Sequence, residues 1–247
     1  MNQLKALVVD DETDIQRIIC DELISQNWEA KGVGDGLLAL EQLKNEKYDV
    51  IISDISMPKM DGLELLREVR KTDKRVVFVL MSAVVTLPLW EGYALGANAF
   101  FGKPFPIHDL TRLLVRMQLP ARQRWAGAGK KTDEFKISNH IELDNGEISE
   151  NFSLGSGGMF VNPGSQNAVK DQILSFRVNM PRFVLEGIGM VMWTRRPGNP
   201  NLAPGLGIEF LYLEDSCREL VASLVIRSQV KAFIPAGAIV KKIAGES

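Results

Sequence analysis

Short β-rich runs of apolar residues alternate with longer helical patterns over residues 1–119. The predicted strands are Leu4–Val9, Trp28–Val33, Val50–Ser53, Val76–Met81 and Ala99–Phe101. The predicted helices are Asp14–Ser25, Gly36–Asn45, Gly62–Lys71, Leu87–Leu95 and Ile107–Leu119. Strict alternation of strands and helices predicts an α/β domain in which helices flank both faces of a five-stranded parallel sheet.

The pattern changes after residue 119. Residues 120–134 are rich in small, basic and helix-breaking residues and have no sustained period, which is typical of a linker. β-rich runs separated by Gly, Asn and Pro then follow, at Phe135–Leu143, Glu147–Leu154, Met159–Asn162, Ile173–Asn179, Arg182–Arg195 and Leu206–Leu213. An amphipathic helix at Asp215–Arg227 closes the series. We therefore predict an all-β barrel domain with a C-terminal helix over residues 135–228, and residues 229–247 show no clear pattern.

Composition narrows the class of protein. Of 247 residues, 45% are hydrophobic and 24% are charged, as in ordinary globular proteins. The longest mainly apolar stretch, Val76–Trp90, is too short and too interrupted to span a bilayer, and the N-terminus lacks the features of a secretory signal. We expect a cytoplasmic protein whose two distant cysteines are ordinary packing thiols.

Charge is divided unevenly but weakly along the chain. Residues 1–120 hold 14 Lys and Arg against 18 Asp and Glu, a net charge of −4, and the remaining residues hold 15 against 13, a net charge of +2. Neither part has the strong basic excess of a nonspecific DNA-binding domain, so no DNA partner is predicted.

Polar residues stand at the ends of four of the five strands predicted in the first domain. Asp10 and Asp11 follow the first strand, Asp54 the third, Ser82 the fourth and Lys103 the fifth. Open parallel sheets bind their ligands just beyond the carboxyl ends of the strands. Carboxylates within about 5 Å would repel each other by roughly 3 kcal/mol per pair at an effective dielectric near 20, and a divalent cation would remove that repulsion. Oxygen ligands without His or Cys favour Mg²⁺.

These residues resemble the receiver domain of two-component response regulators. The resemblance covers residues 3–119 and rests on four motifs in order: Asp10-Asp11-Glu12, Asp54-x-x-Met57-Pro58-x-Met60-Asp61-Gly62, Met81-Ser82-Ala83 and Lys103-Pro104-Phe105. It implies a protein phosphorylated by a sensor histidine kinase or a phosphotransfer protein. It also implies a cis peptide bond between Lys103 and Pro104.

The resemblance assigns a role to each residue of the acidic site. Asp54 would accept the phosphoryl group, and Mg²⁺ would be held by Asp10, Asp11, Asp54 and the backbone carbonyl of Ser56. Lys103 would contact the phosphoryl oxygens, and Ser82 and Phe100 would form the switch pair. The chemistry agrees, because a carboxylate can attack a phosphoryl group whose charge has been neutralised by cations.

Each of these residues could also have a simpler role. Taken singly, Asp10 or Asp11 could cap a helix, Ser82 could bond to the local backbone and Phe100 could be a core residue. An aspartyl-phosphate phosphatase would also use a nucleophilic Asp on an α/β scaffold, but on its first strand. Here the strongest nucleophile candidate lies on the third strand, so we expect a phosphoacceptor and not a turnover enzyme.

The second domain resembles the PilZ domain, a small β-barrel that in many members binds cyclic di-GMP. The resemblance covers residues 130–228 and rests on the runs 147–161, 189–195 and 205–210. It implies ligand contacts at Asn151, Ser153 and Gly158, and at a preceding arginine pair. The motif here departs from the family pattern.

The departures concern both halves of the cyclic di-GMP motif. The glycine expected three residues after Ser153 is displaced, as though two residues had been inserted, and the Arg-x-x-x-Arg pair is missing before the barrel. Arg122 and Arg124 stand near its place with a different spacing. Two output hypotheses remain open: a cyclic di-GMP sensor, or an interaction module for a downstream protein that has lost the nucleotide.

Overall fold

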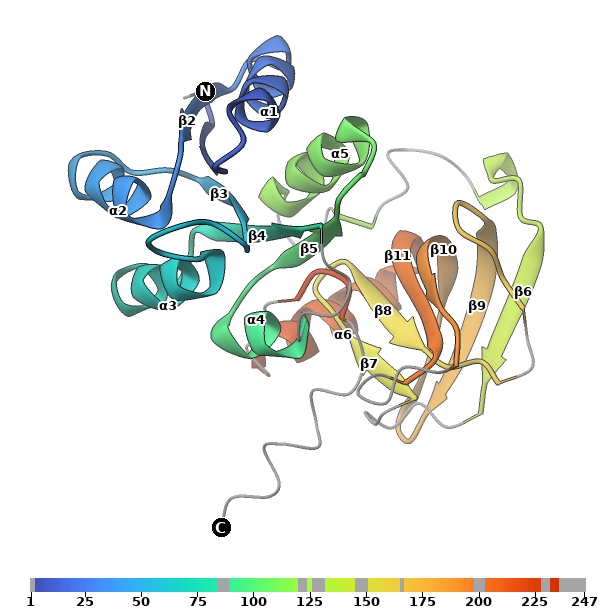
Figure 1. Cartoon of the computed structure of the whole chain (residues 1–247). Coiled ribbons are helices and arrows are strands. Elements are labelled where there is room, and N and C mark those ends of the chain that lie inside the picture. Colours follow the sequence, from blue (N-terminus) through green and yellow to red (C-terminus); the bar gives the residue numbers. More distant parts are fainter. Residues whose placement is uncertain are drawn as a thin grey trace. The chain divides into compact units, whose positions relative to one another are not determined.

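The computed structural model describes residues 3–83, 89–119, 124–125, 132–144, 151–164, 167–197, 203–227 and 232–235. The chain divides into two compact units, Met1–Gln118 and Leu119–Ser247 (Figure 1). None of the helices in these described ranges has both the length and the apolar composition needed to cross a bilayer.

The first unit contains a five-stranded parallel sheet, as predicted. Its strands are β1 (Lys5–Val9), β2 (Glu29–Val33), β3 (Val50–Asp54), β4 (Val77–Ser82) and β5 (Ala99–Gly102). The strand order is β2-β1-β3-β4-β5, and every pair of neighbours is parallel. Strand β3 extends one residue further than predicted, because Asp54 pairs with Met81 at the end of the β3–β4 ladder.

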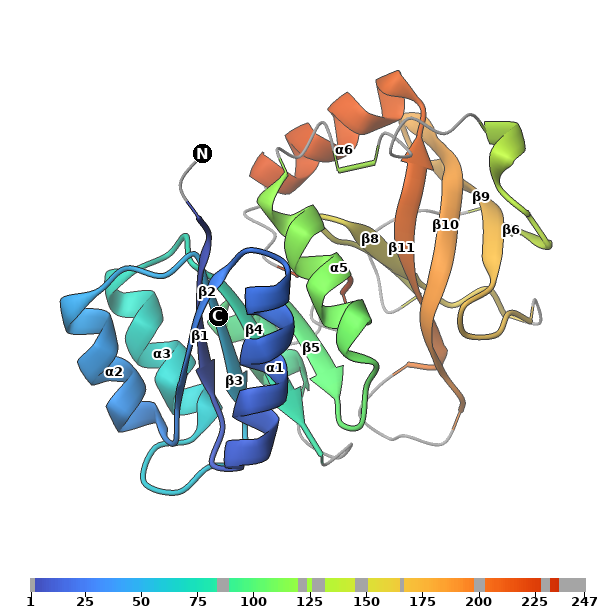
Figure 2. The ribbon, with the colours of Figure 1, turned by 90° about the horizontal axis from the view of Figure 1, so that it is seen from above.

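Helices cover both faces of this sheet, which explains why its interior strands β1, β3 and β4 are nearly continuous apolar runs, whereas the edge strand β2 carries exposed charged residues. They are α1 (Thr13–Ser25), α2 (Gly36–Asn45), α3 (Gly62–Thr72), α4 (Leu89–Leu95) and α5 (Ile107–Gln118). Figure 2 shows α1 and α5 on one face of the sheet and α2 and α3 on the other. The predicted start of the fourth helix at Leu87 lies outside the described residues.

Local sequence fixes where two of these helices begin. The Asp61 side chain accepts a hydrogen bond from the Glu64 N–H at 2.7 Å, and the Glu64 carboxylate accepts one from the Asp61 N–H, so a capping box starts α3. The Asp35 side chain caps α2 in a similar way through the Leu38 N–H. These caps hold the loops that follow β2 and β3.

The second unit is a mixed sheet with one helix after it. Its elements are the short 3₁₀ helix η3 (Thr132–Glu134), β6 (Asn139–Leu143), β7 (Phe152–Leu154), β8 (Gly158–Val161), β9 (Ile173–Met180), β10 (Phe183–Arg195), β11 (Gly205–Leu213) and α6 (Asp215–Arg227). The strand order is β6-β9-β10-β11-β8-β7. Neighbours are antiparallel except for β6 and β9, which are parallel.

The prediction of an all-β barrel is therefore corrected to a six-stranded half-barrel. A closed barrel would need β6 to pair with β7, but these strands lie at opposite ends of the strand order within the described residues. Strand β6 also starts at Asn139, later than predicted, and residues 147–150 of the next predicted strand lie outside the described residues.

Two segments that we predicted to lie outside the barrel are buried against it. Trp125, placed in the linker by its sequence neighbours, is fully buried, and its ring meets the Phe210 ring edge-on at 5.8 Å. Residues 232–235, which showed no pattern, are buried as well, and Phe233 is fully covered. Single large apolar residues can anchor segments whose surroundings read as loop, because one buried aromatic side chain covers about 150–250 Å².

Candidate functional site

Lys103 brings together the two carboxylates that end β1 and β3. Its Nζ lies 2.7 Å from Asp10 Oδ2 and 2.8 Å from Asp54 Oδ1. The Glu12 carboxylate lies further out, with Oε1 at 3.7 Å from the same ammonium. Because β1 and β3 are neighbours, their two carboxylates lie side by side, and the Lys103 side chain, which follows the edge strand β5, reaches both of them.

The second oxygen of each buried carboxylate accepts a hydrogen bond from the backbone N–H two residues further along the chain. Asp10 Oδ1 accepts a hydrogen bond from the Glu12 N–H at 3.0 Å, and Asp54 Oδ2 accepts one from the Ser56 N–H at 2.8 Å. Both carboxylates are therefore held in orientation by one cation and one amide each.

Burial dominates the electrostatics of this cluster. It raises the pKa of Asp54 above its ordinary value, although the hydrogen bond from Lys103 opposes that rise. Burial would lower the pKa of Lys103, but the hydrogen bonds to Asp10 and Asp54 outweigh it and leave that pKa raised. Lys103 is therefore a fixed positive charge, and Asp54 is a carboxylate that would gain from more positive charge nearby.

The donors at this site suit a hard cation in kind. Asp10 and Asp54 offer carboxylate oxygens. The backbone carbonyl of the exposed residue Ser56, two residues after Asp54, is a further oxygen donor. Asp11 is exposed and has not joined them: among the described residues, no three His, Cys, Asp or Glu side chains are grouped as metal ligands. The structure thus brings two of the three predicted acidic ligands together.

The predicted switch residues lie on β4 and β5. Ser82 is buried, and its carbonyl accepts a hydrogen bond from the Lys103 N–H at 2.7 Å. The Phe100 ring packs against α4, edge-on to Tyr93 at 4.8 Å. A β carbon at Gly92 would lie 2.3 Å from Phe100 Cζ, so the ring occupies space that only glycine leaves open. The Lys103–Pro104 peptide bond is cis, as the resemblance implied.

Comparison with known proteins identifies this arrangement. The family described as the response regulator receiver domain matches residues 6–115. Sporulation initiation phosphotransferase F of Bacillus subtilis is 31% identical over 123 residues, which cover 49% of this chain and 98% of that protein. The chain belongs to the response regulator receiver family. Its first unit is the receiver domain.

Other relatives share the receiver unit within longer proteins. The transcriptional regulatory protein YkoG of Bacillus subtilis is 30% identical over 145 residues, and the chain spans 60% of its length. Among solved structures, the receiver domain of sensor histidine kinase PA1611 from Pseudomonas aeruginosa PAO1, determined with a magnesium ion in its active-site cleft, is 29% identical. It covers 47% of this chain and 97% of its own, with a TM-score of 0.43.

One ion pair between a buried carboxylate and an exposed lysine in the receiver unit was not predicted. The Asp35 carboxylate is 3% exposed and accepts a hydrogen bond from Lys59 Nζ at 2.6 Å. This hydrogen bond, with the one from the Leu38 N–H, lowers the pKa of Asp35. The pair ties the start of α2 to the loop that carries Ser56. Asp35 before a helical pattern was a capping signal, but nothing in the sequence linked it to Lys59.

The second unit spreads its predicted ligand residues over different environments. Arg122 lies outside the described residues. Arg124 is partly buried and donates to the Leu119 and Ser156 carbonyls at 2.8 and 3.3 Å. Asn151 is exposed and accepts a hydrogen bond from the Asn162 side chain, whereas Ser153 is 9% exposed within β7.

The glycines of the altered motif are covered by the chain itself. A β carbon at Gly158 would lie 2.2 Å from the Ile208 carbonyl oxygen and 2.9 Å from Ile234 Cγ1. At Gly157, a β carbon would lie within the Phe233 ring. These glycines therefore admit neighbouring protein atoms and leave no cradle for a ligand. The motif residues present do not fit cyclic di-GMP.

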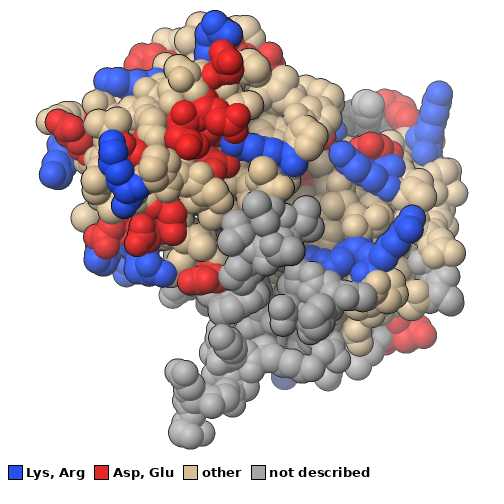
Figure 3. All heavy atoms as spheres, viewed as in Figure 1, with Lys and Arg blue, Asp and Glu red and all other residues tan. Residues whose placement is uncertain are grey.

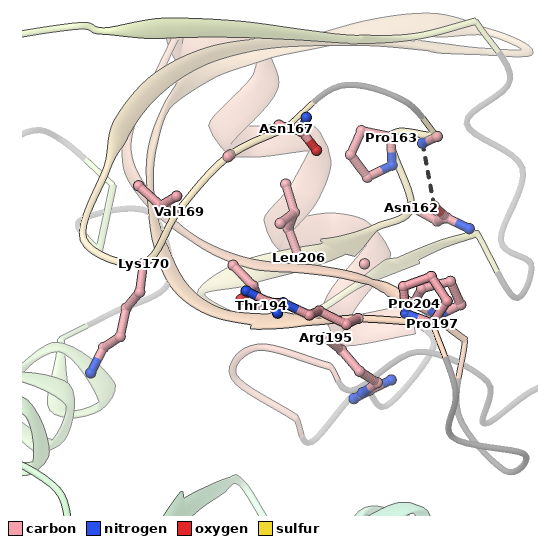
Figure 4. Close-up of a pocket in the computed structure, with 14 residues that line it drawn as sticks. Asn162, Pro163, Asn167, Val169, Lys170, Thr194, Arg195, Pro197, Pro204 and Leu206 are labelled. Atoms are coloured by element: carbon pink, nitrogen blue, oxygen red, sulfur yellow. Dashed lines mark hydrogen bonds between the residues drawn. The ribbon is translucent and has the colours of Figure 1, made fainter.

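A separate pocket lies at the other end of β8. It has a volume of about 390 Å³ and is lined by the loop that follows Val161 and by the β10–β11 connection. Figure 4 shows Leu206 and Asn167 facing each other across it, while the Lys170 side chain extends away. The pocket lining contains none of the predicted ligand residues.

The described surface carries both signs of charge. On the face shown in Figure 3, acidic and basic side chains of the receiver unit are interspersed and form no broad basic patch.

Proposed function

We propose that Asp54 is the phosphoacceptor of a two-component response regulator. The observation that carries this proposal is the convergence of Asp10 and Asp54 on the Lys103 ammonium, at 2.7 and 2.8 Å. Asp54 Oδ1, now paired with Lys103, would attack the phosphorus of a phosphohistidine on a sensor kinase or phosphotransfer protein. The P–N bond breaks, the histidine leaves, and an acyl phosphate forms on Asp54.

Mg²⁺ would be held by Asp10, Asp54 and the Ser56 carbonyl, with Asp11 turning inward to join them. When bound it supplies further positive charge to neutralise the phosphoryl oxygens. Two groups of this chain would assist the transfer. Lys103 would pair with a phosphoryl oxygen, and the Ser56 N–H, which donates a hydrogen bond to Asp54 Oδ2, would orient the nucleophile.

Signalling from Asp54 would pass through β4 and β5. The added phosphoryl charge would draw the Ser82 hydroxyl toward it, and Phe100 would leave its place on Gly92 and Tyr93 to move behind Ser82. The face made by α4, β5 and α5 would then change. We propose that this protein is a stoichiometric phosphoacceptor and not a turnover enzyme.

A labelling experiment tests the acceptor. A small phosphodonor with Mg²⁺ should add one phosphoryl group, seen as an increase in intact mass, and Asp54→Asn should abolish it. Asp49→Asn, which alters an Asp of the same unit just before β3, is the matched control. Full labelling of Asp54→Asn would move the acceptor elsewhere, and continuous hydrolysis of phosphate monoesters would favour the phosphatase alternative.

For the second unit we propose a PilZ-like output module that acts on a downstream protein and has lost cyclic di-GMP binding. The burial of Ser153 and the covered glycines support this version over the sensor. Isothermal titration of the whole protein with cyclic di-GMP should give no heat at tens of micromolar. Saturable heat with a stoichiometry of one or two nucleotides per chain would restore the sensor hypothesis.

A further inference from the structure

The turn between β7 and β8, residues 155–157, holds another part of the chain through main-chain hydrogen bonds. The Ser156 N–H donates to the Ala232 carbonyl at 2.8 Å, and the Gly157 N–H donates to the Phe233 carbonyl at 2.9 Å. Residues 232–235 therefore lie along this turn, with bends at Phe233 and Ile234.

Three further backbone groups of the turn are also engaged. The Ser156 carbonyl accepts from Arg124 Nη1 at 3.3 Å, and the Gly157 carbonyl accepts from the Phe210 N–H at 2.9 Å. The Gly155 N–H closes the hairpin by donating to the Gly158 carbonyl at 2.8 Å. With residues 232–235 in place, these donors and acceptors are used within the second unit.

The shape of the turn matches these four residues closely. A β carbon at Gly157 would lie 2.0 Å from the Phe233 ring, and one at Gly155 would lie 2.4 Å from the Phe233 carbonyl oxygen. Such distances are shorter than real β carbons tolerate, so both positions must be glycine while the segment is bound. Phe233 itself is fully buried.

We propose that the β7–β8 turn is a binding site for an apolar peptide segment, and that its resident ligand is this chain's own segment Ala232–Pro235. Main-chain hydrogen bonds supply affinity, and the glycine-lined seat for the Phe233 ring supplies specificity. The segment follows the last helix, so its release breaks no strand pairing of the six-stranded sheet. The proposal does not depend on the chemistry of Asp54.

The test uses the full chain with Phe233→Ala, and Val184→Ala as a control that removes an exposed apolar side chain of the same unit. In Phe233→Ala, hydrogen exchange at the Ser156 and Gly157 amides should accelerate at least tenfold, with β9 and β10 unchanged. A fluorescent peptide of residues 230–237 should then bind Phe233→Ala at least tenfold more tightly than it binds the wild type. Adding Gly157→Ala to that variant should remove the binding.

Four results would overturn the proposal. One is unchanged exchange at both amides in Phe233→Ala, and another is equal binding of the peptide to all variants. The third is loss of cooperative unfolding of the second unit in Phe233→Ala, which would make the segment part of the core and not a ligand. A wild-type dimer that dissociates on Phe233→Ala would instead place the segment in a second copy and reject the intramolecular assignment.

Discussion

Replacing Lys103 with Met would leave two buried carboxylates without their shared cation. The ammonium lies 2.7 and 2.8 Å from Asp10 and Asp54, and the three side chains are 13%, 0% and 7% exposed. At an effective dielectric of about 20, each pair interacts by roughly 6 kcal/mol before desolvation is counted. Removing one partner of a buried ion pair costs about 3–5 kcal/mol. We expect Lys103→Met to lower the free energy of unfolding of the receiver unit by about 3 kcal/mol at pH 7.5 without Mg²⁺.

Acid should relieve this loss. Burial already raises the pKa of Asp54, and the substitution removes the hydrogen bond that opposes the rise. A carboxyl group whose pKa is higher in the folded state binds more protons when folded, so stability falls as pH rises between the unfolded and folded pKa values. The slope reaches about 1.4 kcal/mol per pH unit for one proton. The deficit of Lys103→Met should therefore shrink from pH 7.5 to pH 5.

Hydrogen exchange of β1 and β3 across a urea series, at both pH values and with EDTA, measures this deficit. Lys5→Met is the control, because Lys5 also joins two carboxylates, at 2.9 Å from Glu29 and 2.5 Å from Glu46, but its side chain is 35% exposed. Exposed pairs contribute little, so Lys5→Met should change stability only slightly. Equal losses in the two variants, or a Lys103→Met deficit independent of pH, would refute the reasoning from burial.

Three further changes probe the receiver unit. Asp11→Asn should weaken Mg²⁺ binding, measured by titration calorimetry, while Asp14→Asn should not; equal affinities would remove Asp11 from the metal site. Gly92→Ala should displace the Phe100 ring and destabilise the unit by about 1–3 kcal/mol through overpacking. Gly102→Ala should be tolerated, because no atom lies within 4 Å of the added β carbon. Equal urea midpoints for the two variants would show that the Phe100 ring moves aside without cost. Asp61→Ala should cost about 1 kcal/mol by removing the helix cap, and an unchanged midpoint would contradict a stabilising capping box.

The receiver unit could be predicted because its signals are local and repeated. Four of the five strands read as apolar runs bounded by polar residues, and parallel pairing places the residues that end the strands at one side of the sheet. Asp10, Asp54 and Lys103 were therefore found from the sequence. The position of Asp11 could not be predicted, since whether an exposed side chain turns inward depends on what it binds.

The second unit was harder to predict because its decisive contacts are long-range. Trp125 stands among linker-like residues, and only its packing on Phe210 shows that it belongs to the core. The glycines after Ser153 matched a ligand motif approximately, but the structure fills their space with Phe233, which lies about 75 positions further along the chain. A single sequence does not show which distant residue a glycine makes room for.

The Lys103 ammonium joins strands that the sheet keeps three places apart, because β3 and β4 lie between β1 and β5. A covalent change at Asp54 would alter how the Lys103 ammonium is shared between Asp10 and Asp54. The residues that follow β1 and β5 would then respond together. The effect of the modification would thus reach the edge strand β5 by an electrostatic route, without first disturbing the backbone hydrogen bonds that join β3, β4 and β5.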